Sequence, residues 1–283
     1  MTVRGVEIER RGPVGWIIIN DYQATVEAAA SDPDSVGVHE GVGQALDELR
    51  WDSSVRVVVL TGRNDGEFYR FSRRTHWDDP VHRGRLDPNK HFGPGAPQPQ
   101  GTARRPDAHE LLMLIEKPVV ARVNGDAIGF GQSLLWGCDI VIARDDARIA
   151  WGHTGLGEIV DSDGEERGYP WAQTPPYGLA AILSMPPAKT KEYMMLSKVM
   201  TGKELADLGV FNYAVPADEL DGVVDRIVGE LLRRPPRVLA RIKAVCNKHV
   251  RNQVNLTEDL GLAYGILDFW EHAAAGAWEE DGD

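Results

Sequence analysis

The stretch from Lys117 to Ala150, KPVVARVNGDAIGFGQSLLWGCDIVIARDDARIA, combines β-branched runs with a turn of small residues. Residues 118–124 (PVVARVN) are predicted to form a buried strand, and residues 129–137, which open from a glycine turn, a buried helix. Residues 139–143 (DIVIA) and 147–151 (ARIAW) are predicted to be further short strands. Strands and a helix in this order predict an α/β core.

The sequence on the amino-terminal side of this stretch shows the same alternation. Residues 16–20 (WIIIN) and 55–61 (VRVVVLT) are predicted strands, and residues 39–50 a helix with apolar residues at helical spacing. The run at 55–61 is rich in Val and Leu, as expected of a strand that is covered on both faces. Residues 62–105 are polar, aromatic and rich in Pro and Gly, and their stretch 91–100 (HFGPGAPQPQ), which has no core-forming pattern, is predicted to be a mobile loop.

The last third of the chain is predicted to be helical. Residues 219–234 place apolar side chains on one stripe, and residues 256–270 do the same. Between them, Val238, Ile242 and Val245 begin another helical stripe after Pro235-Pro236. Apolar helix faces that need a partner surface predict oligomerisation. We divide the chain into a core domain, residues 1–205, and a C-terminal helical region, residues 206–283.

Composition and charge argue against several classes of protein. The chain has 283 residues, of which 42% are hydrophobic and 26% charged, so it can bury a sizeable core. Its formal net charge of −12 argues against nucleic acid or an anionic membrane as a partner. Two cysteines make no disulfide framework, and no apolar run has the ~20 residues of a membrane helix or the character of a signal peptide. We predict a cytoplasmic protein.

Three segments together resemble the crotonase (enoyl-CoA hydratase/isomerase) superfamily. Residues 117–150 resemble its core segment, with a strand, Asn-Gly, a small-residue turn, a helix, Cys-Asp and a strand. Residues 57–72 (VVVLTGRNDGEFYRFS) resemble the first oxyanion loop of the family, and residues 196–215 its link into the C-terminal helices. The resemblance implies a crotonase-like ββα superhelix core, a C-terminal α-helical trimerisation region, and a homotrimer or dimer of trimers.

The resemblance also implies an oxyanion hole made by the backbone N–H groups of Ser72 and Phe130. N–H groups in the first turn of a helix have no carbonyl partner within that helix, and the helix dipole adds positive potential there. Each such donor stabilises charge on a carbonyl oxygen by about 3–4 kcal/mol. The alternative interpretation of Gly125, Gly129 and Gly131 is tight turning and close packing only.

This sequence departs from the family's hydratases at both of their catalytic glutamates, whose positions fall on Ser133 and His153. Hydration by two glutamates is therefore not expected. His153 followed by Asp163 resembles instead the β-diketone hydrolase branch, which includes 6-oxocamphor hydrolase. A histidine can act as a general base near neutral pH, and a carboxylate can orient it. We favour Asp163 over Asp161 as the partner of His153.

The predicted substrate pocket is hydrophobic. Six residues are expected to contact the substrate: Phe71, Ser133, Trp151, Trp171, Tyr177 and Tyr264. The alternative for Ser133 is an inert small replacement, and for Trp171 and Tyr177 it is ordinary packing. The histidines at positions 76, 82 and 91 fit no standard ligand spacing, so no metal site is predicted.

The leading hypothesis is hydrolysis of a C–C bond in a cyclic β-diketone, a retro-Claisen reaction. His153 would activate water, and the N–H groups of Ser72 and Phe130 would hold the enolate. This chemistry needs no cofactor. One alternative is an enoyl-CoA hydratase, isomerase or related enzyme, with a CoA thioester as its substrate. Another is a non-catalytic binding subunit with the crotonase fold.

Overall fold

The computed structural model describes residues 5–20, 38–69, 108–151, 185–196 and 198–248, with residues 250 and 252. In these ranges the larger sheet has six strands in the order β1-β2-β3-β5-β7-β10. β1 pairs antiparallel with β2, and the remaining neighbours pair in parallel. The strands are β1 (Val6–Arg11), β2 (Val14–Ile19), β3 (Val57–Gly62), β5 (Val119–Val123), β7 (Ile140–Arg144) and β10 (Tyr213–Val215).

A smaller sheet has the strand order β4-β6-β8-β9 in the described part of the chain. Its strands are β4 (Gly66–Tyr69), β6 (Gly125–Ile128), β8 (Arg148–Ala150) and β9 (Met200–Thr201). β4, β6 and β8 run parallel to one another, whereas β9 is antiparallel to β8. The carboxyl ends of β4, β6 and β8 therefore lie at one edge.

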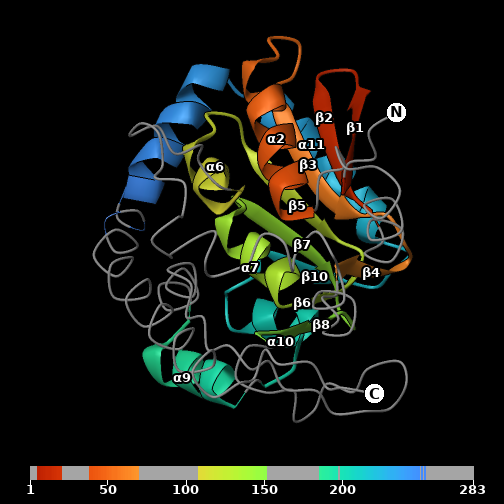
Figure 1. Cartoon of the computed structure of the whole chain (residues 1–283), viewed down its shortest axis with the longest axis vertical. Helices are drawn as coiled ribbons and strands as arrows, with labels where there is room; N and C mark the ends of the chain where they lie inside the picture. Colours follow the sequence, from red (N-terminus) through yellow and green to blue (C-terminus); the bar gives the residue numbers. More distant parts are fainter. Residues whose placement is uncertain are drawn as a thin grey trace, which may run out of the picture.

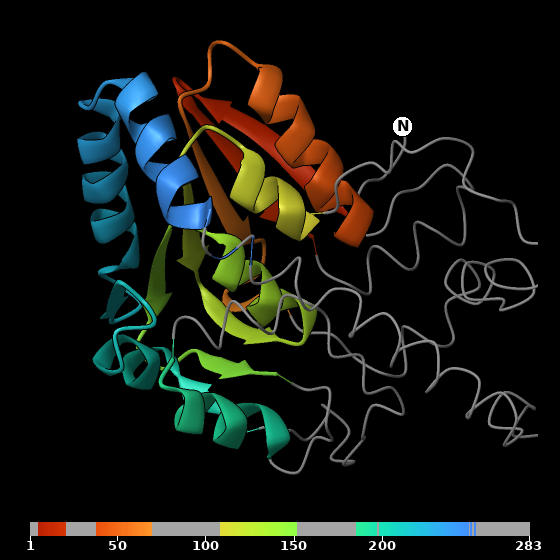
Figure 2. The same cartoon turned by 90° about the vertical axis from the view of Figure 1, so that its left-hand side faces the viewer.

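Helices cover both faces of the larger sheet (Figures 1 and 2). α2 (Val38–Trp51) and α6 (Ala108–Leu114) lie on one face, and α11 (Leu220–Leu232) on the other. In β3, Val58 and Leu60 join the core cluster that contains α2 and α6, and Val57 and Val59 join the cluster that contains α11. Burial on both faces explains why this strand is apolar at almost every position.

Four further helices complete the described fold. α7 (Phe130–Gly137) joins β6 to β7, α9 (Pro187–Met195) precedes β9, and α10 (Gly202–Asp207) follows it. α10 begins with a capping box, in which the Thr201 side chain accepts from Glu204 N–H and the Glu204 carboxylate accepts from Thr201 N–H. A helix over residues 236–248 follows α11.

The predicted α/β core is confirmed, as are the strands expected at 16–20, 55–61, 118–124, 139–143 and 147–151. The loop predicted over residues 91–100 lies outside the described residues, and β4 (Gly66–Tyr69) is a strand that the sequence did not predict. β4 has four residues, too few to show a periodicity, and it is defined by its pairing with β6. The division of the chain after residue 205 stays a prediction. β10, which lies in the predicted C-terminal region, pairs with β7 of the core domain.

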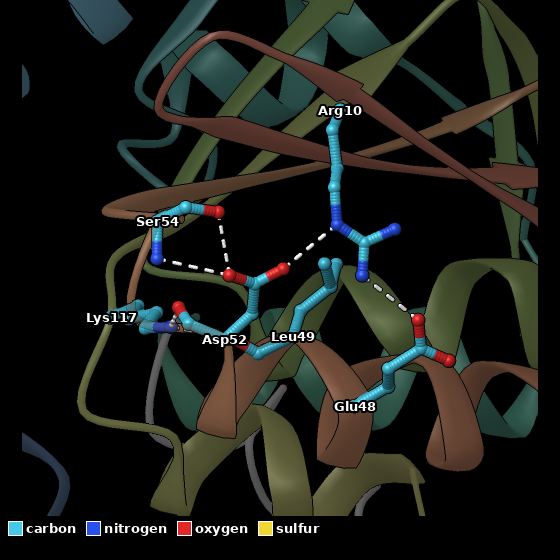
Figure 3. Close-up of polar contacts among 6 residues, drawn as sticks. All are labelled: Arg10, Glu48, Leu49, Asp52, Ser54 and Lys117. Atoms are coloured by element: carbon cyan, nitrogen blue, oxygen red, sulfur yellow. Dashed lines mark hydrogen bonds and ion pairs between the residues drawn. The ribbon is translucent and has the colours of Figure 1, made fainter.

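Lys117 joins the end of α2 to the amino-terminal edge of the larger sheet (Figure 3). Its ammonium group donates to the carbonyl oxygens of Leu49, at 2.5 Å, and Asp52, at 2.6 Å. The Asp52 carboxylate accepts from the Ser54 hydroxyl at 2.6 Å and from Arg10 Nε at 2.7 Å. These hydrogen bonds, first that from Ser54, hold the pKa of Asp52 well below its usual range.

An ion pair between the buried Lys243 and the partly buried Asp139 lies at the same edge, where β5 and β7 begin. Lys243, on the helix over residues 236–248, donates to Asp139 Oδ2 at 2.7 Å and to the Lys117 carbonyl oxygen at 3.2 Å. The Lys243 side chain is only 5% exposed. Burial raises the pKa of Asp139, and the nearby Lys243 charge opposes that shift. This network fastens the helix over residues 236–248 to the sheet.

In the ranges that the structure describes, no helix combines the length and the apolar character needed to cross a bilayer.

Candidate active site at the start of helix α7

Three strands of the smaller sheet end beside the first residue of α7. β6 leads into α7 through Gly129, whose N–H donates to the carbonyl oxygen of Ala150, the last residue of β8, at 3.1 Å. The ring of Tyr69, the last residue of β4, lies edge-on to the ring of Phe130 with centroids 5.9 Å apart. In parallel sheets, ligands bind outside the carboxyl ends of the strands. This edge is therefore the candidate site.

Glycines allow these segments to approach one another. A Cβ atom on Gly131 would lie 2.4 Å from the Tyr69 carbonyl oxygen, and one on Gly125 would lie 1.8 Å from the Gly66 carbonyl carbon. Gly129 has a φ of +61°, in the left-handed region that glycine adopts without strain. The structure thus shows close packing at Gly125 and Gly131 and a tight turn at Gly129. The absence of a side chain at Gly131 lets the end of β4 approach the start of α7.

Phe130 is the first residue of α7, so its N–H is one of the four that have no acceptor within the helix. The aligned peptide dipoles of this eight-residue helix make the potential positive here. The Phe130 side chain is buried, and its ring makes edge-on contacts with the rings of Tyr69 and His109, whose centroids lie 5.9 Å and 5.3 Å from its own. The position suits the oxyanion donor that the sequence predicts, and the role itself stays a prediction.

Asn124, which the sequence analysis named only as part of the Asn-Gly motif, holds the segment between β3 and β4. Its side chain is buried, and its Oδ1 accepts from Gly62 N–H at 3.0 Å. Its Nδ2 donates to the carbonyl oxygens of Asn64, at 2.6 Å, and Glu67, at 3.0 Å. One amide thereby fixes the path of the chain into β4, the strand that ends at the site.

Ser133 lies one turn beyond Phe130 on α7 and is buried. Its hydroxyl donates to the Phe130 carbonyl oxygen at 2.9 Å, and its Oγ lies 2.8 Å from His109 Nε2. His109, on α6, is a residue that the sequence analysis missed. It is 24 positions from Ser133 in the sequence, and no spacing rule joins two residues on separate helices.

Gln132, next to Ser133 on α7, is fully buried. Its Oε1 accepts from Trp136 Nε1 at 2.6 Å and from the Tyr193 hydroxyl at 3.2 Å, which joins α7 to α9. Its Nε2 is buried and has no hydrogen-bond partner in the described part of the chain. Burial raises the pKa of Tyr193, so this phenol stays protonated and keeps donating.

The structure brings together only some of the predicted site residues. Trp151, directly after β8, is buried in the main core cluster, and its contact with substrate stays a prediction. The rest lie outside the described residues: Phe71, Ser72, His153, Asp161, Asp163, Trp171, Tyr177 and Tyr264. In the sequence, Ser72 follows Tyr69 by three residues and His153 follows Trp151 by two.

Among the described residues, no group of three or more His, Cys, Asp or Glu side chains could hold a metal ion.

The fold and the site define an α/β protein in which the carboxyl edge of parallel strands meets the start of a helix. The family model described as "Enoyl-CoA hydratase/isomerase" matches residues 96–263, more than half of the chain. The chain belongs to the enoyl-CoA hydratase/isomerase family, so the resemblance to the crotonase superfamily is confirmed.

The chain is similar to carnitinyl-CoA dehydratases. That of Salmonella arizonae is 28% identical over 241 residues, which cover 85% of this chain and 79% of the relative. Among solved structures, an enoyl-CoA hydratase from Mycobacterium avium subsp. paratuberculosis K-10 aligns with a TM-score of 0.67 at 20% identity. The alignment covers 95% of this chain and 98% of the hydratase chain. A carnitinyl-CoA dehydratase from Mycobacterium avium 104 has a TM-score of 0.63 at 22% identity, covering 94% and 92%. These structures confirm the fold.

Proposed function

We propose that this protein acts on an acyl-CoA thioester, as a hydratase, dehydratase or double-bond isomerase. The observation that carries the proposal is the meeting of β4, β6 and β8 at the start of α7, with Gly131 against the Tyr69 carbonyl oxygen. Membership of the enoyl-CoA hydratase/isomerase family and the similarity to carnitinyl-CoA dehydratases support a CoA thioester as the substrate class. This was the alternative to the diketone hypothesis in the sequence analysis.

In the proposed mechanism, the thioester carbonyl oxygen accepts from Phe130 N–H and Ser72 N–H. Negative charge grows on that oxygen as the enolate forms, so these donors bind the transition state more tightly than the substrate. Removal of one such donor costs roughly 10²–10³-fold in rate in comparable sites. His153, oriented by Asp163, would exchange a proton with water or with the leaving hydroxyl. The predicted aromatic contacts would surround the acyl chain.

The test is a substrate screen with purified protein. Crotonyl-CoA and carnitinyl-CoA are followed by the absorbance of the conjugated thioester, beside cyclic 1,3-diketones followed by loss of their enol absorbance. We expect turnover of at least one CoA thioester and a large loss of it in His153→Ala. Turnover of a diketone by a protein that binds no CoA thioester would refute the proposal. Binding of a thioester without turnover would favour the non-catalytic subunit.

Hydrolysis of a β-diketone is the second candidate, and one observation favours it. A serine hydroxyl stands on α7 where hydratases of the family carry a glutamate, so that carboxylate is missing for water activation. In this mechanism His153 and Asp163 would activate water, and the same N–H groups would hold the enolate released by C–C cleavage. The screen separates the two candidates directly.

We also propose that the chain assembles as a homotrimer or a dimer of trimers through its C-terminal helices. On the helix over residues 236–248, Val238, Ile242 and Val245 are 47%, 55% and 75% exposed. Three apolar side chains at helical spacing form a surface that a second copy could cover. Light scattering should give three or six times the mass of one chain, and a monomer would refute this.

A further inference from the structure

We infer that Ser133 and His109 form a proton-transfer pair that removes and returns the α-proton of the substrate. The inference rests on the proposed acyl-CoA function and names the group that stands in for the missing glutamate on α7. It is carried by the 2.8 Å contact between Ser133 Oγ and His109 Nε2, one helical turn from the Phe130 N–H that is proposed to hold the carbonyl oxygen. The α-carbon of a thioester is bonded to that carbonyl carbon.

The packing of α6 on α7 sets the contact between Ser133 and His109. Leu112 lies against Gly137 so closely that a Cβ on Gly137 would be 2.9 Å from Leu112 Cβ. His109 is one turn before Leu112 on α6, and Ser133 is one turn before Gly137 on α7. The two helices therefore run alongside each other in the same direction, and the close approach at Gly137 places His109 opposite Ser133.

Both side chains of the pair are held in position. Ser133 Oγ lies within hydrogen-bond distance of both the Phe130 carbonyl oxygen, at 2.9 Å, and His109 Nε2, at 2.8 Å. The His109 ring lies edge-on to the Phe130 ring at an interplanar angle of 87°. Catalytic groups work when their rotamers are fixed by such packing and hydrogen bonds.

A serine hydroxyl alone is a poor base, but an imidazole in contact with it can accept its proton. The Ser133 hydroxyl has one proton, which it can give either to the Phe130 carbonyl oxygen or to His109 Nε2. With Nε2 unprotonated, the hydroxyl donates to the imidazole and its oxygen can take a proton from carbon. The pair thus does at one position what a single carboxylate would do.

The step is balanced in atoms and charge. The α-carbon C–H bond breaks, and its electron pair forms the enolate whose oxygen is held by the N–H groups. The proton passes to Ser133 Oγ while the serine proton passes to His109 Nε2, so an enolate and an imidazolium form from neutral groups. Reversal of both transfers returns the proton to carbon. Ser133 touches the substrate, and His109 acts through it as a positioning residue that also stores the proton.

The competing explanation is that His109 merely fastens α6 to α7. His109→Gln separates the two, because a Gln amide can still donate to Ser133 Oγ but cannot take up a proton. Met113→Gln is a matched control, since it places the same side chain one turn further along α6.

The experiment measures deuterium uptake into the α-position of butyryl-CoA in D₂O, a saturated thioester that can exchange this proton but cannot be hydrated. We expect His109→Gln and Ser133→Ala each to lower kcat for exchange by about 10²-fold or more, with little change in KM. The double variant should lose no more than either single variant, because the two groups act as one unit. Met113→Gln should exchange at the wild-type rate.

Two outcomes would overturn the inference. Wild-type exchange by His109→Gln would reduce His109 to a structural hydrogen-bond donor, and the acyl-CoA function would stand. Absence of exchange by the wild-type protein would also remove the inference, and turnover of crotonyl-CoA or carnitinyl-CoA would then decide whether the proposed function falls with it.

Discussion

Gly131→Ala tests whether the approach of β4 to α7 makes the site. The added Cβ would lie 2.4 Å from the Tyr69 carbonyl oxygen, whereas ordinary contact begins at 3.4 Å, so Tyr69 must withdraw by about 1 Å. The segment that leaves β4 at Tyr69 carries Ser72, the second proposed donor. A misplacement of about 1 Å in a catalytic constellation can cost about 10²-fold in rate, and we expect kcat to fall by that factor.

The same substitution should have a moderate effect on stability. Inserting a methyl group into a close contact costs about 1–3 kcal/mol, partly offset by the helix propensity of Ala. Gly222→Ala on α11 is the control, because a Cβ there meets no atom within 4 Å. It should raise the free energy of unfolding by about 0.5–1 kcal/mol and leave kcat unchanged.

We would compare Gly131→Ala and Gly222→Ala by steady-state kinetics on the CoA thioester that the wild-type protein turns over. Urea unfolding of both variants would give their stabilities. If Gly131→Ala retains wild-type kcat, the reasoning that joins the two halves of the oxyanion hole through this contact is wrong.

Three further predictions concern the framework around the site. Lys243→Met should lower the free energy of urea unfolding by about 3–5 kcal/mol because it leaves the partly buried Asp139 carboxylate without its cation, and Asp139→Asn in the same chain should restore part of that loss. Lys189→Met, in an exposed pair, should cost less than about 1 kcal/mol, and equal losses in the two lysine variants would contradict the argument. The pKa of Asp52 is lowered in the folded state, so near this pKa the unfolded state binds more protons than the folded state, and the stability that Asp52 contributes is lost as pH falls below about 3.8. The difference in Tm between wild type and Asp52→Asn should therefore shrink at low pH, and a difference that stays constant with pH would refute this. Gly125→Ala should cost at least about 3 kcal/mol in thermal unfolding because its Cβ would meet a backbone carbon at 1.8 Å, and a normal Tm would show that β4 and β6 can separate freely.

Local patterns in the sequence were sufficient for the framework. The Val and Leu run that forms β3 and the small-residue turn that opens α7 are recognisable because burial on both faces and tight turning each demand particular residue types within a few positions. The same stretches carried the family resemblance, and the position of Phe130 at the start of α7 followed from it. The sequence alone also shows where this chain departs from the family's hydratases, since a serine occupies position 133, where they carry a glutamate.

Contacts between distant segments were decided only by the tertiary structure. β4 has too few residues to show a pattern, and it exists because Gly125 lets it pair with β6. His109 meets Ser133 because Gly137 lets α6 pack closely on α7, and nothing within either helix encodes that meeting. The periodicity of apolar residues in a segment shows which of its side chains face the core and which face solvent. It does not show which other segment packs against that face, because this depends on the packing of the whole fold.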